Sequence, residues 1–257
     1  MPLSPRPLRC ALLLALGLLL PACRGEAPKP AAEPIRVAAA ADLAAAFEEI
    51  GRLFERQTGE RVSFTFGSTG LAAKQLREGA PFDLFAAANV SYVDEVIAAG
   101  SCDAQTKAGY ARGRIVLWTQ GGEGRTAPRS VAELADPRFV RLAIANPEHA
   151  PYGVAAREAL TSSGIWEKVQ PRLVLGENVR QALQFAETGN VEAAFVALSL
   201  VVRKEGGAWT LVDESLHRPI DQALVACRNG RRFEGGKAFG AFVNSPAGRE
   251  VMRRYGF

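Results

Sequence analysis

A Ser-Thr pair is the stretch of this chain with the clearest capacity for binding chemistry. Ser68 and Thr69 lie between two glycines. The preceding segment RVSFTF (61–66) alternates as a strand does, and the following segment GLAAKQLREG (70–79) has helical spacing. The first backbone N–H groups of a helix have no intrahelical partner, and the helix dipole favours negative charge there. A strand, a tight turn and a helix start that carries two hydroxyl donors therefore predict a binding site for an anion.

Three further turns have the same character. Asp42 follows the strand-like segment that begins at residue 35, Tyr152 stands in a Pro-Tyr-Gly turn, and Val179 follows Glu-Asn. Each turn precedes a segment of helical periodicity, and Asp42 is placed to cap the helix expected over 43–59. Ligands of open α/β sheets bind where helix starts meet outside the carboxyl ends of strands. Together with the Ser-Thr turn, these turns predict an anion cleft.

Two other uses of these residues are excluded by their surroundings. A nucleotide-binding loop needs Gly-Lys-Ser/Thr at a fixed spacing, and Lys74 is misplaced for that pattern; no G-x-G-x-x-G is present either. Ser68, His149 and Asp42 contain the groups of a nucleophilic triad, but the chain has no G-x-S-x-G elbow. We therefore expect a binding protein and no enzyme.

Cysteine and histidine are too sparse for a transition-metal site. Outside the first 23 residues the chain has only Cys102 and Cys227, and its two histidines are His149 and His217. No C-x-x-C or His/Cys cluster occurs, so no metal or cofactor is expected. An oxidising compartment permits a disulfide between the two cysteines, but the sequence leaves open whether they pair or stay separate buried thiols.

The N-terminal region has the features of an export signal. A short basic region precedes the apolar run ALLLALGLLL (11–20), which is too short to span a bilayer. We predict a signal peptide over 1–22 and a flexible, Pro- and Ala-rich tether over 23–34. Cys23 follows Leu-Pro-Ala, which loosely matches a lipid-attachment pattern, although Pro21 is unusual there. Export to the periplasm is expected, and both lipid anchoring at Cys23 and release after cleavage stay open.

Alternating strands and helices predict an α/β fold in two lobes. Strands such as 61–66 and 82–88 alternate with helical segments, which favours sheets that are mainly parallel and flanked by helices. The chain of 257 residues is long enough for two lobes. We expect the first lobe to comprise 34–112 and 218–257, with the second lobe, 113–217, inserted in it.

Within the second lobe, three elements are expected from local pattern. GRIVLWTQ (113–120) predicts a long strand, and Ser130 is a candidate cap for a short helix over 130–139. VEAAFVALSLV (191–201) predicts a buried strand throughout its length.

The net charge excludes one class of function, and the N-terminal segment excludes another. The net charge is +4, and two of these charges lie in the export segment, which is too little for nucleic-acid binding. A transcription regulator that uses a similar two-lobed domain needs a helix-turn-helix at one end, whereas this N-terminus has the features of an export signal.

Several segments together resemble the periplasmic molybdate-binding proteins of ABC importers. The resemblance rests on VAAAADLAAAFEEI, FGSTGLAAKQLREGAPFDLFAAA, NPEHAPYGVAAREAL, GENVRQAL, AAFVAL and RRYGF, and it covers nearly the whole chain after the export segment. It implies a type II solute-binding fold with the ligand in the cleft between the lobes, a monomer, and delivery of molybdate or tungstate to a membrane permease.

The resemblance also implies a set of contacts. The oxyanion would be held by neutral donors at Asp42, Ser68, Thr69, Tyr152 and Val179, with no direct bond to the metal atom. Tyr152 and Val179 would contribute backbone N–H groups. Some members add a tyrosine hydroxyl where this chain has Ala197, so that contact is missing here.

Asp42 departs from the neutral residue that many members carry. An ionised carboxylate only accepts hydrogen bonds and repels a dianion. In one reading the backbone N–H of Asp42 meets the ligand while the carboxylate caps its helix. In the other, the carboxylate accepts a proton carried by the ligand, which would favour phosphate or another oxyanion. Molybdate and tungstate are larger than sulfate, so sulfate in a ring of donors set for the larger ions would leave some donors unpaired. The sequence does not separate molybdate from tungstate.

Overall fold

Two five-stranded sheets form the framework of the molecule. The computed structural model describes Met1, residues 33–122 and residues 126–257. The expected signal peptide (1–22) and all but the last two residues of the expected tether (23–34) lie outside the described residues, apart from Met1. No helix in the described part is both long and apolar enough to cross a membrane.

The first sheet has the order β2-β1-β3-β10-β4. Its strands are β1 (Ile35–Ala40), β2 (Val62–Gly67), β3 (Leu84–Ala87), β4 (Ala108–Gly113) and β10 (Ile220–Ala226). β1 pairs in parallel with β2 and β3, while β10 runs antiparallel to β3 and β4. The carboxyl ends of β1, β2 and β3 therefore meet at one edge. The helices around this sheet are α1 (Ala44–Thr58), α2 (Thr69–Arg77), α3 (Val90–Ala98), α8 (Phe233–Val243) and α9 (Pro246–Arg254).

The second sheet has the order β7-β6-β8-β5-β9. Its strands are β5 (Ile115–Gln120), β6 (Leu142–Ala145), β7 (Leu173–Gly176), β8 (Ala193–Ala197) and β9 (Gly207–Leu211). β6 is parallel to β7 and β8, and β5 is antiparallel to β8 and β9. Its helices are α4 (Pro151–Ser162), α5 (Trp166–Val169), α6 (Val179–Glu187) and α7 (Leu198–Val201).

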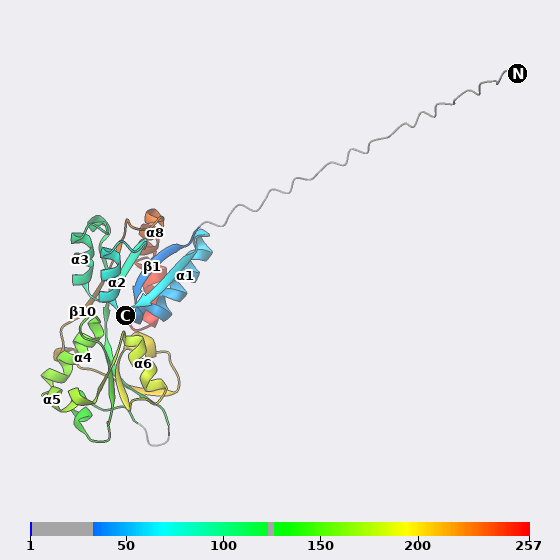
Figure 1. The fold of residues 1–257 in the computed structure, drawn as a ribbon. Coiled ribbons are helices and arrows are strands. Elements are labelled where there is room, and N and C mark those ends of the chain that lie inside the picture. The colour runs from blue at the N-terminus through cyan, green and yellow to red at the C-terminus, as the bar shows by residue number, and fades with distance from the viewer. Residues whose placement is uncertain (2–32, 123–125) are drawn as a thin grey trace. The chain divides into compact units, whose positions relative to one another are not determined.

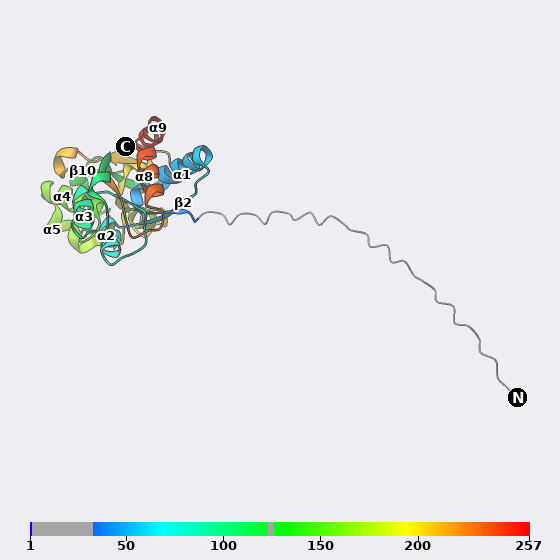
Figure 2. The ribbon, with the colours of Figure 1, turned by 90° about the horizontal axis from the view of Figure 1, so that it is seen from above.

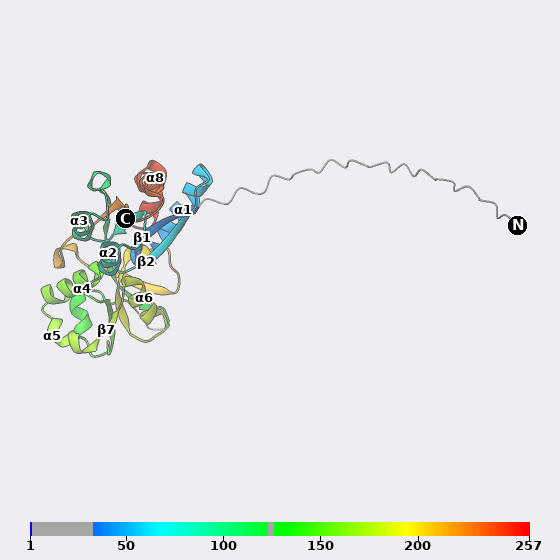
Figure 3. The ribbon, with the colours of Figure 1, turned by 45° about the horizontal axis from the view of Figure 1, so that its top comes forward.

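The two sheets define two lobes, named here the first and the second lobe after their sheets. In Figure 1 the first lobe, with α1, α2, α3 and α8, lies above the second, with α4, α5 and α6. The tilted view of Figure 3 shows the same division, with β1 and β2 above β7. Seen from above in Figure 2, the terminal helices α8 and α9 lie beside α1, with which both are in contact. The C-terminal helices thus return to the first lobe.

An aromatic cluster holds α1 against the first sheet. The ring of Phe239 in α8 meets Phe47 and Phe54 of α1 edge to face, with centroids 5.8 and 5.4 Å apart. Phe64 of β2 packs against Phe47 and Phe239. Edge-to-face packing adds to the burial of apolar surface. The cluster fixes α1, and with it the turn between β1 and α1 that carries Asp42.

The local pattern missed one strand of the first sheet. β4 (Ala-Gly-Tyr-Ala-Arg-Gly) contains two glycines and no β-branched residue, so its own propensity for strand is low. Pairing with β10 makes it a strand. The strand expected over 113–120 begins only at Ile115, because Gly113 ends β4.

Two expectations in the second lobe were wrong in detail. Ser130 makes no capping hydrogen bond, and the helix expected over 130–139 is a short 3₁₀ helix, Val131–Ala135. The strand expected over 191–201 ends at Ala197 and continues as helix α7. All-apolar sequence does not distinguish a buried strand from a buried helix, so periodicity could not place this boundary.

Cys102 and Cys227 form a disulfide, which the sequence left open. They face each other in an isolated antiparallel bridge with Cα atoms 3.8 Å apart, and the bond joins positions separated by 125 residues.

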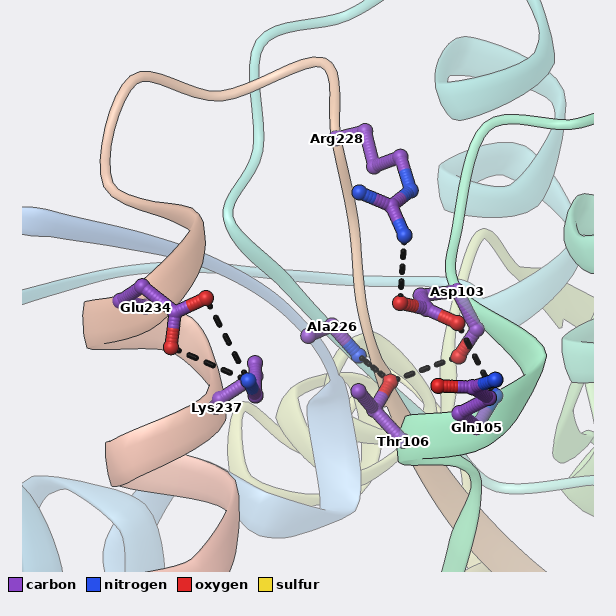
Figure 4. A network of polar contacts seen from close by, with 7 residues as sticks. All are labelled: Asp103, Gln105, Thr106, Ala226, Arg228, Glu234 and Lys237. Atoms are coloured by element: carbon purple, nitrogen blue, oxygen red, sulfur yellow. Dashed lines mark hydrogen bonds and ion pairs between the residues drawn. The ribbon is translucent and has the colours of Figure 1, made fainter.

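Figure 4 shows polar contacts made by residues that neighbour these cysteines in sequence. Thr106 Oγ1 accepts from the Ala226 N–H at 2.9 Å and donates to the Asp103 carbonyl at 2.7 Å. The Arg228 guanidinium pairs with the Asp103 carboxylate at 2.6 Å. The disulfide and these contacts fasten the end of β10 to the loop before β4.

Candidate functional site

A small pocket brings together all five residues expected from the sequence. Asp42, Ser68, Thr69, Tyr152 and Val179 line it, from both lobes. The centre of a water-sized sphere can move within only about 10 Å³ of this pocket. In this arrangement of the lobes, such a space holds only one small species. None of the described residues that line it is a Lys, Arg or His.

The N-terminal ends of four helical segments form the walls of the pocket. β1 continues into a 3₁₀ turn, Ala41–Leu43, and then α1; β2 leads through Ser68 into α2. Tyr152 occupies the first turn of α4, after Pro151 at its start. Because the orphan N–H groups of a helix lie in its first turn, these starts direct donors into the pocket.

The fourth wall is the start of α6. Asn178 caps this helix, and its side chain accepts from the N–H groups of Arg180 and Gln181 at 3.0 and 3.1 Å. The Val179 N–H is not among the groups that this cap engages. This N–H is therefore not used by the cap, and Val179 lines the pocket.

The Thr69 hydroxyl accepts a hydrogen bond from the protein and keeps a proton that it can donate. The side chain is 2 % exposed, and its Oγ1 accepts from the Ala88 N–H at 3.1 Å. A hydroxyl that accepts one hydrogen bond keeps its own proton for donation. In this pocket Thr69 can therefore donate to an anion while Ala88 fixes its orientation.

Ser68 connects the two lobes. Its Oγ lies 2.7 Å from the His149 carbonyl oxygen and 2.8 Å from His149 Nδ1. The Gly70 N–H donates to the same carbonyl at 2.9 Å. One arrangement satisfies every atom: His149 Nδ1–H donates to Ser68 Oγ, and Ser68 donates to the carbonyl. The N-terminus of α2 is thereby joined to the loop before α4.

The Asp42 carboxylate does not cap α1, contrary to expectation. Neither the 3₁₀ turn nor α1 has a side-chain capping bond. Asp42 Oδ2 instead accepts from the Tyr152 hydroxyl at 2.9 Å and from Gln222 Nε2 at 2.7 Å. Because the 3₁₀ turn precedes α1, Asp42 is already within helical structure, and its side chain turns toward α4 and β10.

Burial changes the protonation of this carboxyl. Asp42 is 1 % exposed, and its desolvation raises the pKa to about 6, although contacts with Gln222, Tyr152 and its own backbone N–H act to lower it. The Ser199 hydroxyl, from α7, donates to the Asp42 backbone carbonyl at 2.8 Å. Both ends of this residue are thus held by the second lobe. Its carboxylate is directed to Tyr152 and Gln222, so Ser68, His149 and Asp42 do not form a catalytic relay.

Sequence reasoning missed three participants: His149 as a contact between lobes, Ser199 and Gln222. Only Gln222 left a signal. In β10 it shares a face with Ile220 and Leu224, and a polar residue on an otherwise apolar face is unusual. Gln222 is 1 % exposed, in keeping with that signal. Ala197 lies buried at the end of β8 and offers no hydroxyl.

Two mixed α/β lobes whose helix starts enclose a small polar pocket are the architecture of a periplasmic solute-binding protein. Residues 35–257 match the model of the bacterial extracellular solute-binding proteins. The chain belongs to this family and, within it, to the group of the molybdate-binding proteins ModA. Their shared property is binding of a solute and no catalysis.

The similarity extends over nearly the whole chain. The molybdate-binding protein ModA of Rhodobacter capsulatus is 36% identical over 256 residues, covering 98% of this chain and 97% of that protein. ModA of Azotobacter vinelandii is 35% identical, covering 96% of each. The solved structure of the periplasmic molybdate-binding protein of Azotobacter vinelandii superposes with a TM-score of 0.82 at 26% identity, covering 86% of this chain and 97% of that one. These matches confirm the two-lobed fold.

Proposed function

We propose that this protein captures molybdate or tungstate between its lobes and delivers the ion to an ABC permease. The observation that carries the proposal is the pocket itself: it is small, it is closed by four helix starts, and its lining offers hydroxyl and N–H donors without a cationic side chain. A tetrahedral dianion presents four acceptor oxygens and needs such donors. The ion is bound through its oxygens, with no protein bond to the metal atom and no cofactor.

The donors divide between the lobes. From the first lobe we assign the Thr69 hydroxyl and the backbone N–H groups of Thr69 and Asp42. From the second we assign the N–H groups of Tyr152 and Val179. Ser68 lies beside them, and its hydroxyl is engaged with His149, so we propose that it serves mainly to hold the lobes together around the ion.

The contacts between the lobes support a hinged capture. Ser68 with His149, and Asp42 with Tyr152 and Ser199, join the lobes on either side of the pocket. An ion could enter only if these contacts opened, since they lie beside the space it would occupy. We propose that the lobes, 34–112 with 218–257 and 113–217, move as bodies about the crossings between them.

The cellular setting follows from the family. An extracellular solute-binding protein acts outside the cytoplasmic membrane, and we propose that this one works as a monomer. A relative from Bacillus subtilis, 30% identical over 87% of this chain, is described as a putative substrate-binding lipoprotein of an ABC transporter. Lipid attachment at Cys23 is the corresponding proposal here; the intact mass of the mature protein tests it.

Thermal unfolding with single oxyanions tests the ligand. A ligand that binds only the folded protein stabilises it by about 2.7 kcal/mol at a hundredfold excess over Kd. We expect molybdate and tungstate to raise Tm by a similar amount, and sulfate and phosphate to have little effect at equal concentration. A rise with phosphate alone would instead support the second candidate, a phosphate-binding protein in which Asp42 accepts a proton from the ligand. No rise with any of the four would refute oxyanion capture.

A further inference from the structure

The two oxygens of the Asp42 carboxyl have different surroundings. Oδ2 accepts from Tyr152 and Gln222, whereas Oδ1 is buried and has no hydrogen-bond partner among the described residues. In a neutral carboxylic acid, the carbonyl oxygen accepts hydrogen bonds and the hydroxyl oxygen donates one. The environment of Oδ2 is that of a carbonyl oxygen. Oδ1 is left as the position for the acid proton, in a residue that lines the pocket.

Among the described residues, none places a cation beside Asp42 that would balance its negative charge. The titratable groups that face it are two tyrosines, Tyr152 from α4 and Tyr110 from β4. Burial holds the pKa of both phenols well above the usual value, so both remain neutral donors. Tyr110 donates to the Ala87 carbonyl at 3.1 Å. An ionised Asp42 beside a bound dianion would therefore place several negative charges together without compensation.

The other elements around Asp42 present neutral groups. β10 contributes the amide of Gln222, α7 the hydroxyl of Ser199 and α6 the side chain of Val179. β2 has no titratable residue. Among the charged residues of the surrounding helices and of β10, Glu48, Arg180 and Glu187 line an outer groove, and Asp221 with Arg112 and Glu158 with Arg218 form exposed ion pairs.

We propose that Asp42 binds the oxyanion as a carboxylic acid, so that each dianion is captured together with one proton on Asp42 Oδ1. The proton comes from solvent, forms the Oδ1–H bond and is returned when the ion leaves; no other bond is made or broken. The inference rests on the proposed function, because the dianion supplies the charge that retains the proton. A protonated Asp42 is a hydrogen-bond donor and therefore selects a fully deprotonated oxyanion. If the anion carried its own proton, two protons would lie between Asp42 Oδ1 and the oxygen of the ion that faces it.

The coupling has a defined pH dependence. With a pKa of about 6 before binding, Asp42 is about one-tenth protonated at pH 7, and a dianion at hydrogen-bond distance raises that pKa further. Binding at pH 7 should take up about 0.9 proton per ion, and binding at pH 5 about 0.1. The affinity should fall about 50-fold between pH 6 and pH 8.

Isothermal titration calorimetry with sodium molybdate, in two buffers of different ionisation enthalpy, measures this uptake directly. The full mature protein is compared with Asp42→Asn, whose amide oxygen can accept from Tyr152 and Gln222 while its NH₂ group donates from the position of Oδ1. We expect proton uptake near zero for D42N, and an affinity at pH 8 close to that of the wild type at pH 6. His149→Gln tests the imidazole that contacts Ser68 beside the pocket; whatever this variant does to the affinity, its proton uptake per bound ion should stay that of the wild type.

Each result decides the matter. Binding of molybdate with no proton uptake at pH 7 and with constant affinity from pH 6 to pH 8 would overturn the inference while leaving the proposed function intact. Uptake that persists in D42N and disappears in H149Q would place the proton on His149 and equally overturn it. An absence of molybdate binding at every pH, in wild type and variants, would refute the proposed function itself.

Discussion

The Thr69 hydroxyl is expected to make two contacts, one to the Ala88 N–H and one to the ion, and replacing it with a methyl group removes both; two different measurements then report on each. Thr69→Val keeps the shape of the side chain but removes the acceptor of the Ala88 N–H and the donor to the ion. A buried N–H left without a partner costs about 1–3 kcal/mol, so the free energy of unfolding should fall by that amount with no ligand added. A hydrogen bond to a charged group contributes about 1.5–3 kcal/mol, so Kd for molybdate should rise about 10- to 150-fold.

Thr69→Ser is the matched control, because it removes only the methyl group and keeps the hydroxyl. Urea unfolding at pH 7 measures the first effect and calorimetric titration with molybdate the second. We expect the Kd of T69S for molybdate to stay within about threefold of the wild-type value, and T69V to weaken binding by at least tenfold. If T69V binds as tightly as T69S, the Thr69 hydroxyl does not donate to the ion. If T69V unfolds at the same urea concentration as the wild type, the Ala88 contact contributes nothing measurable.

Three further results are expected. Because burial raises the pKa of Asp42 from 3.8 to about 6, the folded protein binds this proton more tightly than the unfolded chain; stability contributed by the proton is therefore lost as pH rises through this range, and at 1.36 kcal/mol per pH unit the loss is about 3 kcal/mol. Urea unfolding at pH 4 and pH 7 should show most of this loss in the wild type and none of it in Asp42→Asn; equal pH dependence would contradict the assignment. A Cβ on Gly70 would lie 2.7 Å from the His149 carbonyl oxygen. Gly70→Ala should therefore keep the lobes apart and weaken molybdate binding at least tenfold, without lowering the urea midpoint of the protein alone. An unchanged Kd would show that this contact does not limit closure. Replacing Cys102 and Cys227 by alanine should lower the free energy of unfolding by about 2–5 kcal/mol without altering Kd; a changed Kd would mean that the disulfide positions the pocket.

Local sequence was sufficient to single out the four turns that line the pocket. Small or capping residues before an apolar-periodic helix mark each of these turns, which lie at Asp42, Thr69, Tyr152 and Val179. The rule that helix starts meet at the carboxyl ends of strands then brings these turns together in one pocket.

The orientation of Asp42 could not be predicted in the same way. Its partners Tyr152 and Gln222 are 110 and 180 residues away in sequence. A local pattern shows that Asp42 is able to cap a helix, but not that two buried donors compete for its carboxylate. The raised pKa has the same origin, because desolvation depends on what the rest of the fold places around the group.

The errors in secondary structure have a related cause. β4 is a strand through its pairing with β10, despite a sequence of low strand propensity. The boundary between β8 and α7 falls inside a continuous apolar run, where neither period is visible. Burial and pairing partners, which the chain acquires only when folded, decided both.

The anomalous scattering of molybdenum offers the most direct test of the central claim. A crystal of the protein grown with molybdate should contain one strong anomalous peak, in the pocket between the starts of α1, α2, α4 and α6. Its oxygens should lie within hydrogen-bond distance of the Thr69 hydroxyl and of the backbone nitrogens of Tyr152 and Val179. A fully bound ion whose peak lies outside this pocket, or whose oxygens contact neither Thr69 nor Val179, would contradict the account.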